Sequence, residues 1–222
     1  MTKRVYIETT IPSYLAALPS RGLIQAARQQ ITHEWWMNER QKYDLCISEI
    51  VLEEATAGDT EAVQRRLPFL QDLPLLDLTA TVHDIATAIV DSGLLPRAAT
   101  RDAVHIAVSS VHNVDILLTW NCRHISQCDD NERAWSSGGR MRLRHADPLY
   151  AGGTSWRVID MGQINEKETT DEVIREVRRI KEALAASVDF DVGRVLENAR
   201  QKQHERGRTV LAPPIRKATQ RG

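Results

Sequence analysis

The chain has few cysteines, few aromatic side chains and no long apolar run. Its 222 residues contain three cysteines, an odd number, and no signal-like hydrophobic stretch follows Met1. These absences argue against a disulfide framework and predict a reducing, cytoplasmic location. Cys122 and Cys128 stand near His124 at a spacing that fits no common zinc finger, so we interpret all three thiols as buried or idle. No apolar stretch is long enough to cross a bilayer, and we therefore expect no membrane partner.

The chain also lacks an excess of charge of either sign. Its formal net charge is −1, so overall basicity does not point to nucleic-acid binding. The charge is nevertheless uneven, because seven Lys and Arg residues face the single acid Glu205 between Arg200 and the C-terminus. A hydrophobic content of 42% is enough for the core of one domain with an appendage. The sequence thus predicts a near-neutral globular body with a basic C-terminal tail.

Strands and helices are expected to alternate through the first part of the chain. Strand patterns occupy residues 4–8, 44–48, 75–78 and 115–119. Helical patterns lie between them, at residues 24–43, 48–55, 61–70 and 80–92. A further helix is expected at Pro12, and another from the N-cap Thr100 to His112. This alternation predicts an α/β fold with a parallel sheet flanked by helices, whose sites lie at the carboxyl ends of the strands.

Three acidic residues and one asparagine are spread widely over these elements. Glu8 closes the first strand, Glu54 lies in the helix after the second strand, and Asp102 lies in the first turn of the helix before the fourth strand. Asn121 follows the fourth strand, so all four side chains can converge at one edge of the sheet. Hard cations such as Mg²⁺ bind a few carboxylates together with water and phosphate oxygens, which suits ligands from distant segments. Taken singly, each acid can equally be a solvent-exposed residue or compensate a helix dipole.

The segments that carry these residues resemble the PIN-domain family, and within it the VapC-type toxins of bacterial toxin–antitoxin pairs. The resemblance covers residues 3–125 and is carried, in order, by VYIETTIPSYL, SEIVLEEA and RDAVHIAVSSVHNVDILLTWNCRHI. It implies a PIN-like parallel sheet and a metal-dependent endoribonuclease, in which Mg²⁺ or Mn²⁺ activates a water molecule that cleaves RNA phosphodiesters. It also implies that the catalytic metal ligands are Glu8, Glu54, Asp102 and Asn121.

The sequence departs from the family pattern at two of these positions. Glu8 stands where the family usually has Asp, and Asn121 stands where many members have a fourth Asp. Fewer charges then face the cation, so the site is expected to hold metal more weakly. Thr9 and Thr119 are candidates for holding water or orienting the carboxylates, with simple capping as the alternative. The competing interpretation of the whole chain is a catalytically inert RNA-binding protein or toxin–antitoxin fusion remnant.

Other side chains near the acids are given structural roles. Glu53 is predicted to face solvent, because it points about 100° away from Glu54 around the helix. His105 is expected to pack between elements or lie on the surface, with RNA contact as the alternative. The tryptophans, Trp120 among them, favour core or dimer packing over base stacking, which leaves a homodimer open.

Residues 127–160 have a different character from the expected nuclease domain at residues 1–126. They are polar and show no strand alternation, which predicts an irregular linker. Some choices of codons for residues 142–154 give a nucleotide sequence whose plus-one reading frame encodes a segment that resembles a VapC-like ending. The linker is therefore a candidate frame-shifted toxin end, a hypothesis that the nucleotide sequence would test.

Residues 161–222 resemble a small antitoxin fused behind the toxin. A capping-box signature at residues 169–172 precedes an amphipathic helix, and a second amphipathic stretch ends near Gly207. Two short helices without a core of their own must dock on a larger body. The basic arm, with Arg208, Arg216 and Lys217, is expected to reach the acidic pocket of its own or a neighbouring chain. The alternative is a helical hairpin whose basic tail binds RNA by charge.

Overall fold

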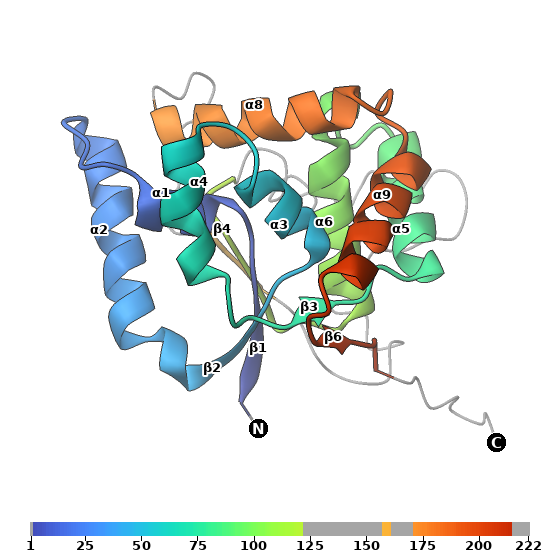
Figure 1. The fold of residues 1–222 in the computed structure, drawn as a ribbon, viewed down its shortest axis with the longest axis horizontal. Coiled ribbons are helices and arrows are strands. Elements are labelled where there is room, and N and C mark those ends of the chain that lie inside the picture. The colour runs from blue at the N-terminus through green and yellow to red at the C-terminus, as the bar shows by residue number, and fades with distance from the viewer. Residues whose placement is uncertain (1, 122–156, 161–170, 215–222) are drawn as a thin grey trace.

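The computed structural model describes residues 2–121, 157–160 and 171–214. In this part of the chain, four parallel strands form a sheet in the order β2-β1-β4-β5 (Figure 1). The strands are β1 (Lys3–Ile7), β2 (Tyr43–Cys46), β4 (Ile116–Thr119) and β5 (Arg157–Asp160). Helices flank this sheet, which confirms the predicted α/β class.

The helices alternate with the strands as expected. After β1 come α1 (Thr10–Ala16) and α2 (Leu23–Asn38), and after β2 come α3 (Glu49–Ala55) and α4 (Thr60–Arg66). Before β4 lie α5 (Ala80–Asp91) and α6 (Thr100–Val111), and the C-terminal segment adds α8 (Glu172–Ala186) and α9 (Val192–Glu205). Single 3₁₀ turns lie at Arg40–Lys42, Leu67–Phe69 and Arg97–Ala99. None of the described helices is long and apolar enough to span a bilayer.

The local sequence accounts for several of these boundaries. Val5 and Ile7 are buried together with the residue between them, as expected for a parallel strand that is covered on both faces. Gly93 follows α5 with a φ of 71°, a conformation that favours glycine and ends the helix where predicted. Thr100 does not cap α6 as predicted, because its hydroxyl donates instead to the carbonyl oxygens of Arg97 and Phe190.

The cysteine that the structure describes is an internal residue. Cys46 is buried at the end of β2, and burial raises the pKa of its thiol to about 12. A thiol with so high a pKa is protonated at neutral pH and chemically inert. Cys122, Cys128 and His124 lie outside the described residues.

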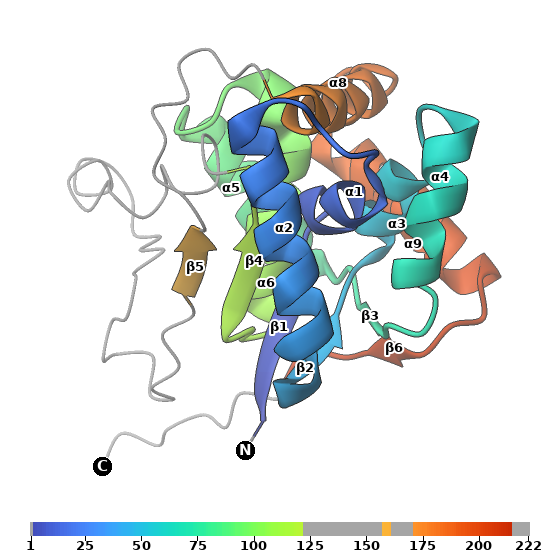
Figure 2. The ribbon, with the colours of Figure 1, turned by 90° about the vertical axis from the view of Figure 1, so that its left-hand side faces the viewer.

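The C-terminal segment, residues 171–214, packs on the rest of the chain. Both ribbon views show α8 crossing the top of the molecule, above the carboxyl ends of β1 and β4 (Figures 1 and 2). It contacts α1, α3 and α6, while α9 packs against α3, α5 and α6. The segment ends in β6 (Val210–Leu211), which pairs in parallel with β3 (Leu75–Leu76). The predicted third strand is thus shorter than expected, and its partner comes from the far end of the chain.

β5 lies at the end of the stretch for which we predicted an irregular linker. It pairs in parallel with β4 along its whole length, from Ile116 beside Arg157 to Thr119 beside Asp160. The remainder of that stretch, including the candidate frame-shifted residues 142–154, lies outside the described residues.

Candidate metal centre

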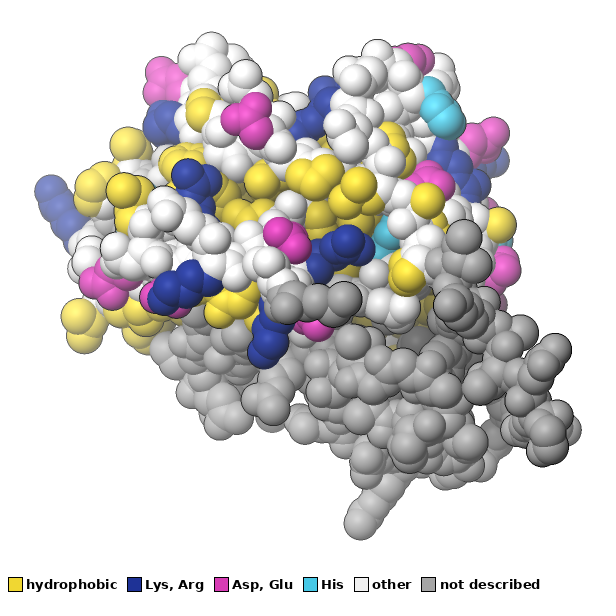
Figure 3. All heavy atoms as spheres, turned by 90° about the horizontal axis from the view of Figure 1, so that it is seen from below, with side chains coloured by type: hydrophobic (Ala, Val, Ile, Leu, Met, Phe, Trp, Pro, Cys, Tyr) yellow, Lys and Arg dark blue, Asp and Glu magenta, His cyan; other side chains and the backbone are white. Residues whose placement is uncertain are grey.

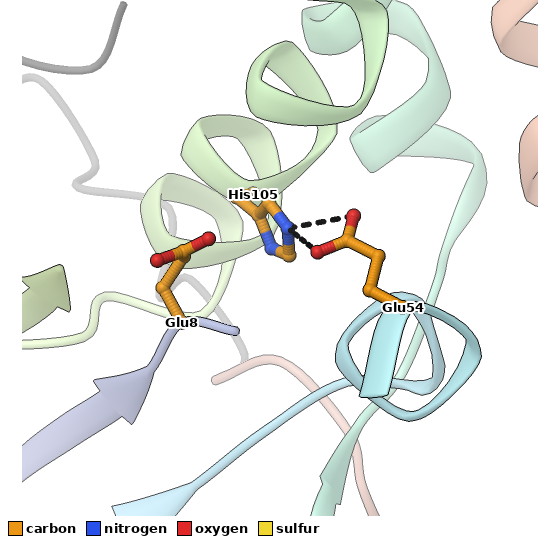
Figure 4. Close-up of side chains that lie close together, drawn as sticks. All are labelled: Glu8, Glu54 and His105. Carbon is orange, nitrogen blue, oxygen red and sulfur yellow. Dashed lines mark hydrogen bonds and ion pairs between the residues drawn. The ribbon is translucent and has the colours of Figure 1, made fainter. Parts of the chain in front are cut away.

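The four predicted ligands lie together at the carboxyl edge of the sheet. Glu8 directly follows β1, and Asn121 follows β4. Glu54 comes from α3, and Asp102 comes from the first turn of α6. All four side chains are buried, although each is polar or charged. Figure 4 shows two of them, Glu8 and Glu54, on either side of His105, with ligand atoms of all three within 4.8 Å of one another.

One oxygen of Glu8 is fixed by threonines and the other faces the cluster. Oε2 accepts hydrogen bonds from the amide of Thr10 at 2.9 Å, from the hydroxyl of Thr10, and from the hydroxyl of Thr119 at 2.8 Å. Oε1 is buried and accepts no hydrogen bond from the described residues. Its partner is the ammonium of Lys181, 2.6 Å away, in an ion pair. The carboxylate is therefore held with one oxygen directed at a cation.

Both oxygens of Glu54 are held by neighbouring side chains. Arg101 Nε donates to Oε1 at 2.8 Å, the Thr9 hydroxyl donates to Oε2, and His105 Nε2 lies 3.2 Å from each oxygen. Burial alone would raise the pKa of Glu54, but Lys181, His105 and Arg101 together lower it well below its usual value. Glu54 is thus an anion at neutral pH.

His105 is an internal residue that orients Glu54. Its Nδ1 lies 2.8 Å from the hydroxyl of Tyr6, which lies 2.7 Å from the hydroxyl of Ser48. Burial raises the pKa of Tyr6 well above its usual value, so the phenol keeps its proton and can donate to Nδ1. In that arrangement Nε2 is the ring nitrogen that donates to Glu54. His105 packs inside the protein, one of the two structural roles that we predicted.

Asp102 and Asn121 are joined directly. Asn121 Nδ2 lies 3.1 Å from both carboxylate oxygens of Asp102 and donates to them. The amide oxygen of Asn121 accepts from Nε of Arg178 on α8 at 3.0 Å. Its backbone amide donates to the Thr119 hydroxyl at 2.9 Å, so this threonine links the ends of β1 and β4.

The ammonium group of Lys181 lies where the three carboxylates meet. Its Nζ is 2.6 Å from Glu8 Oε1, 2.6 Å from Asp102 Oδ1 and 3.8 Å from Glu54 Oε2. The side chain comes from α8 and is only 3% exposed. Burial alone would lower the pKa of Lys181, but Asp102, Glu54 and Glu8 raise it well above its usual value. The cluster therefore contains a positive charge supplied by the C-terminal segment.

A second buried ion pair fastens the start of α8. Asp171 is the N-cap of this helix, and its Oδ1 accepts from two backbone amides of the first turn. Its Oδ2 accepts from Arg28 Nη1 at 3.1 Å and from the hydroxyl of Tyr14. The guanidinium of Arg28 also lies 5.3 Å from the ring centre of Trp120, a residue that packs in the core. The helix therefore begins with Asp171 as its cap and not with the predicted capping box, in which Glu172 would be the third helical residue. The same carboxylate joins α8 to α1 and α2.

Glu53 does not face solvent as we predicted. Its Oε2 accepts from Arg101 Nη2 at 2.9 Å, and its Oε1 accepts from Lys202 Nζ on α9 at 2.7 Å. Glu49, one turn earlier on α3, accepts from Arg206 Nε at 2.7 Å. The prediction was wrong because α9 covers the face of α3 that would otherwise be exposed.

The expected inhibitory arm contacts a different place. Arg208 Nη2 donates to the carbonyl oxygens of Leu70, Gln71 and Leu73, beside β3. Arg216 and Lys217 lie outside the described residues. Among the described residues of the C-terminal segment, the basic side chains that reach the predicted ligands are Lys181 and Arg178, which belong to α8 and not to the tail.

A signal for Lys181 was present in the sequence. The buried positions of α8 are otherwise apolar at its centre, at Val177 and Ile180, and Lys181 stands on the same face four residues after Val177. A single lysine within an apolar stripe is unusual unless a carboxylate faces it. The pattern identifies a buried cation, but the identity of its partners depends on tertiary structure.

The described surface does not carry one continuous basic face in the view from below (Figure 3), where Lys and Arg side chains are interspersed with Asp and Glu. The chain matches no protein-family model, and no curated protein or solved structure matches it either. The interpretation of the site therefore depends on its own geometry.

Proposed function

We propose that this protein is a metal-dependent ribonuclease of the PIN type, similar to VapC toxins, which its own antitoxin-like C-terminal segment holds inactive. The observation that carries the proposal is the position of Lys181 Nζ, 2.6 Å from both Glu8 and Asp102. Buried carboxylates from three distant segments are costly to bring together without a cation between them. Their arrangement is that of a cation site, and α8 supplies a cation of its own.

The donor set suits Mg²⁺ or Mn²⁺. Carboxylate oxygens of Glu8, Glu54 and Asp102 and the amide oxygen of Asn121 would hold the ion, and hard divalent cations prefer such oxygens. Glu8 Oε1 fits this role best, since it is buried and faces a positive charge without accepting a hydrogen bond. When bound, such an ion lowers the pKa of a water molecule and stabilises the charge that develops on a phosphodiester.

The surrounding residues of this chain would keep the ligands in place. Thr119 and Thr10 fix Oε2 of Glu8, which leaves Oε1 for the ion. His105 and Arg101 hold Glu54 from one side and keep it ionised. No side-chain nucleophile is required, because the attacking group in this class of reaction is water.

RNA as the substrate class follows from the resemblance to VapC toxins and not from the surface of the described residues. Three buried carboxylates would repel phosphate, so a phosphodiester would approach only with a divalent ion present. α8 also covers the ligands, through Lys181 at two carboxylates and Arg178 at Asn121. The resting chain is therefore expected to cleave slowly.

The second candidate is an inert remnant of a toxin–antitoxin fusion. The contacts of Glu54 favour it, because Arg101, His105 and Thr9 occupy both carboxylate oxygens independently of Lys181. Such a network is also consistent with a structural core of ion pairs. Cleavage by a variant in which the lysine is removed distinguishes the two functions.

The test compares cleavage of a mixed RNA pool with Mn²⁺ by the full chain and by Lys181→Ala. Removing the ammonium weakens the hold of α8, so we expect Lys181→Ala to cleave about 10- to 100-fold faster than the unmodified protein, the range of a typical coupling free energy. Lys202→Ala is the matched control, since it removes a lysine of α9 that binds Glu53 outside the ligand set. The double variant with Lys181→Ala and Asp102→Asn should lose this increase in cleavage rate. A folded Lys181→Ala protein without Mn²⁺-dependent cleavage would favour the inert remnant.

A further inference from the structure

We propose that α8 and a divalent cation exclude each other at the acidic cluster, so that Mn²⁺ or Mg²⁺ lifts α8 while α9 and β6 stay docked. In this arrangement α8 is a lid that the cation itself opens, and α9 is the anchor that keeps the lid attached. The inference deepens the proposed function and rests on it for the identity of the metal site.

The exclusion follows from shared atoms. Lys181 Nζ lies 2.6 Å from Glu8 Oε1 and from Asp102 Oδ1, so an ion bound to those two oxygens would occupy the space of the ammonium. Arg178 on the same helix holds the amide oxygen of Asn121, a third predicted ligand. A divalent ion interacts more strongly than an ammonium with the same oxygens, but it gains them only when these side chains withdraw. Binding of the ion and docking of α8 are therefore linked, and each weakens the other by the same factor.

The anchor has contacts of its own, away from the ligands. Lys202 of α9 binds Glu53, and Arg206, the residue that follows α9, binds Glu49. Gln203 of α9 donates to Asp77 at 3.1 Å. β6 adds parallel strand pairing with β3, and the main chain of Leu75 and Asp77 donates to the carbonyl oxygens of Thr209 and Leu211. These contacts involve none of the four predicted ligands, so they can persist when α8 leaves.

The connection between the two helices is strained. Asp189 and Phe190 both have positive φ, 58° and 59°, in the five-residue turn between α8 and α9. A bulky side chain rarely adopts this conformation, and consecutive residues in it are held only by the structure around them. Within the turn, the amide of Phe190 donates to the carbonyl oxygen of Ala185 at 2.8 Å. The hydroxyl of Thr100 donates to the carbonyl oxygen of Phe190 at 3.3 Å and ties the turn to α6. We place the hinge of the lid at this turn, since a change of φ here would reorient α8 while α9 stays docked.

The apolar face of α8 opposes opening. Val173, Ile174, Val177 and Ile180 are buried in the closed lid, and opening would expose these apolar side chains to water. Without a divalent ion, the lid is therefore closed in nearly all molecules. The ion increases the open population in proportion to its free concentration over its dissociation constant.

Hydrogen exchange of the full chain tests the lid directly. We expect Mn²⁺ to raise the exchange rate of the α8 amides on the order of tenfold, with no comparable change in α9 or β6. Loss of the free Mn²⁺ signal in electron paramagnetic resonance measures binding in the same samples. Lys181→Met should bind Mn²⁺ on the order of tenfold more tightly, and its α8 should exchange fast with or without the ion. Lys202→Met is the matched control and should respond to Mn²⁺ like the unmodified protein.

The possible outcomes distinguish failure of the lid proposal from failure of the proposed metal site. Mn²⁺ that binds the unmodified protein without raising α8 exchange overturns the lid and leaves the metal site standing. Mn²⁺ that binds only Lys181→Met does the same, because the ion then fails to displace the lysine. If folded Lys181→Met binds no Mn²⁺, the lid and the proposed function both fail.

Discussion

The C-terminal segment meets the rest of the chain in two regions that are built differently. Beneath α8 these charged side chains are buried. Lys181, Glu8 and Asp102 are at most 3% exposed, and Arg28 and Asp171 are at most 4% exposed. Beneath α9 the basic side chains lie at the rim, with Lys202 50% and Arg206 37% exposed. The segment thus has buried ion pairs beneath α8, whereas beneath α9 its ion pairs lie at the edge of an apolar contact.

The two kinds of contact differ in how strongly they depend on one particular partner. A buried ion pair contributes little net stability, because removing both charges from water offsets their attraction, yet losing one partner is costly. Apolar burial, as at Leu196 and Val195 of α9, adds stability without demanding one particular partner. The docking of α8 therefore depends on particular charged partners, whereas that of α9 depends mainly on apolar burial.

The largest effect is expected at the start of α8. Asp171→Ala leaves the buried guanidinium of Arg28 without this carboxylate and removes the helix cap, so it should lower the free energy of unfolding by about 3–5 kcal/mol. Asp191→Ala is the matched control, since Asp191 caps α9 from an exposed position and should cost only about 1 kcal/mol. Urea denaturation of both variants measures the difference. Equal losses of unfolding free energy in the two variants would mean that the buried ion pair of Asp171 adds nothing to its role as a helix cap.

The anchor is expected to depend on apolar packing. Leu196 is fully buried in α9, and Leu196→Ala should cost about 2–5 kcal/mol through lost burial and a cavity. Because the contact is uncharged, the loss should be the same at low and high salt. Thermal and urea denaturation at two salt concentrations provide the test. A loss that shrinks strongly with added salt would place the attachment of α9 in its ion pairs instead.

Acid should weaken the α8 region through Glu54. The folded chain holds the pKa of this carboxyl below its usual value, so its contribution to stability is present above the unfolded pKa of about 4.3 and is lost as the pH falls toward the folded value. The unmodified protein should therefore lose more stability than Glu54→Gln between about pH 5 and the acid limit of folding. Urea midpoints across that range measure the two slopes. Parallel slopes would show that Glu54 is not the titrating group.

The smallest effect is expected at the rim of α9. Lys202→Ala removes a half-exposed partner of Glu53, which retains Arg101, and should cost at most about 1 kcal/mol. High salt should erase most of this difference. Urea denaturation with and without salt measures it. A cost as large as that of Asp171→Ala would remove the distinction between rim and buried charge.

Much of the fold was predictable because local pattern and tertiary structure agree. The alternation of apolar runs with helical periods predicted the parallel sheet, and Gly93 ended a helix for the reason expected of a glycine with positive φ. The convergence of Glu8 with Glu54 was expected, because Glu8 ends a strand and Glu54 lies in the helix that follows the next one, and both places adjoin the carboxyl edge of a parallel sheet. Their assignment to a metal-dependent ribonuclease stays a proposal.

The rest depended on contacts between distant segments. Glu53 was expected in solvent, because a short helix gives no indication that α9 will cover its second face. Lys181 was overlooked because its charge is matched by carboxylates far away in the sequence, and periodicity does not identify partners. Arg208 was expected at the acidic pocket because the tail is basic, but its guanidinium donates to backbone carbonyl oxygens instead.

The order of the chain gives the position of Lys181 a consequence during synthesis. The lysine is made about 60 residues after Asn121, so at roughly 5–20 residues per second the ribosome completes the four predicted ligands about 3–12 s before Lys181. In that interval a nascent chain would expose an acidic cluster with no ammonium to fill it. Under the proposed exclusion between the ion and α8, Mg²⁺ that binds the carboxylates in that interval would have to be displaced by α8.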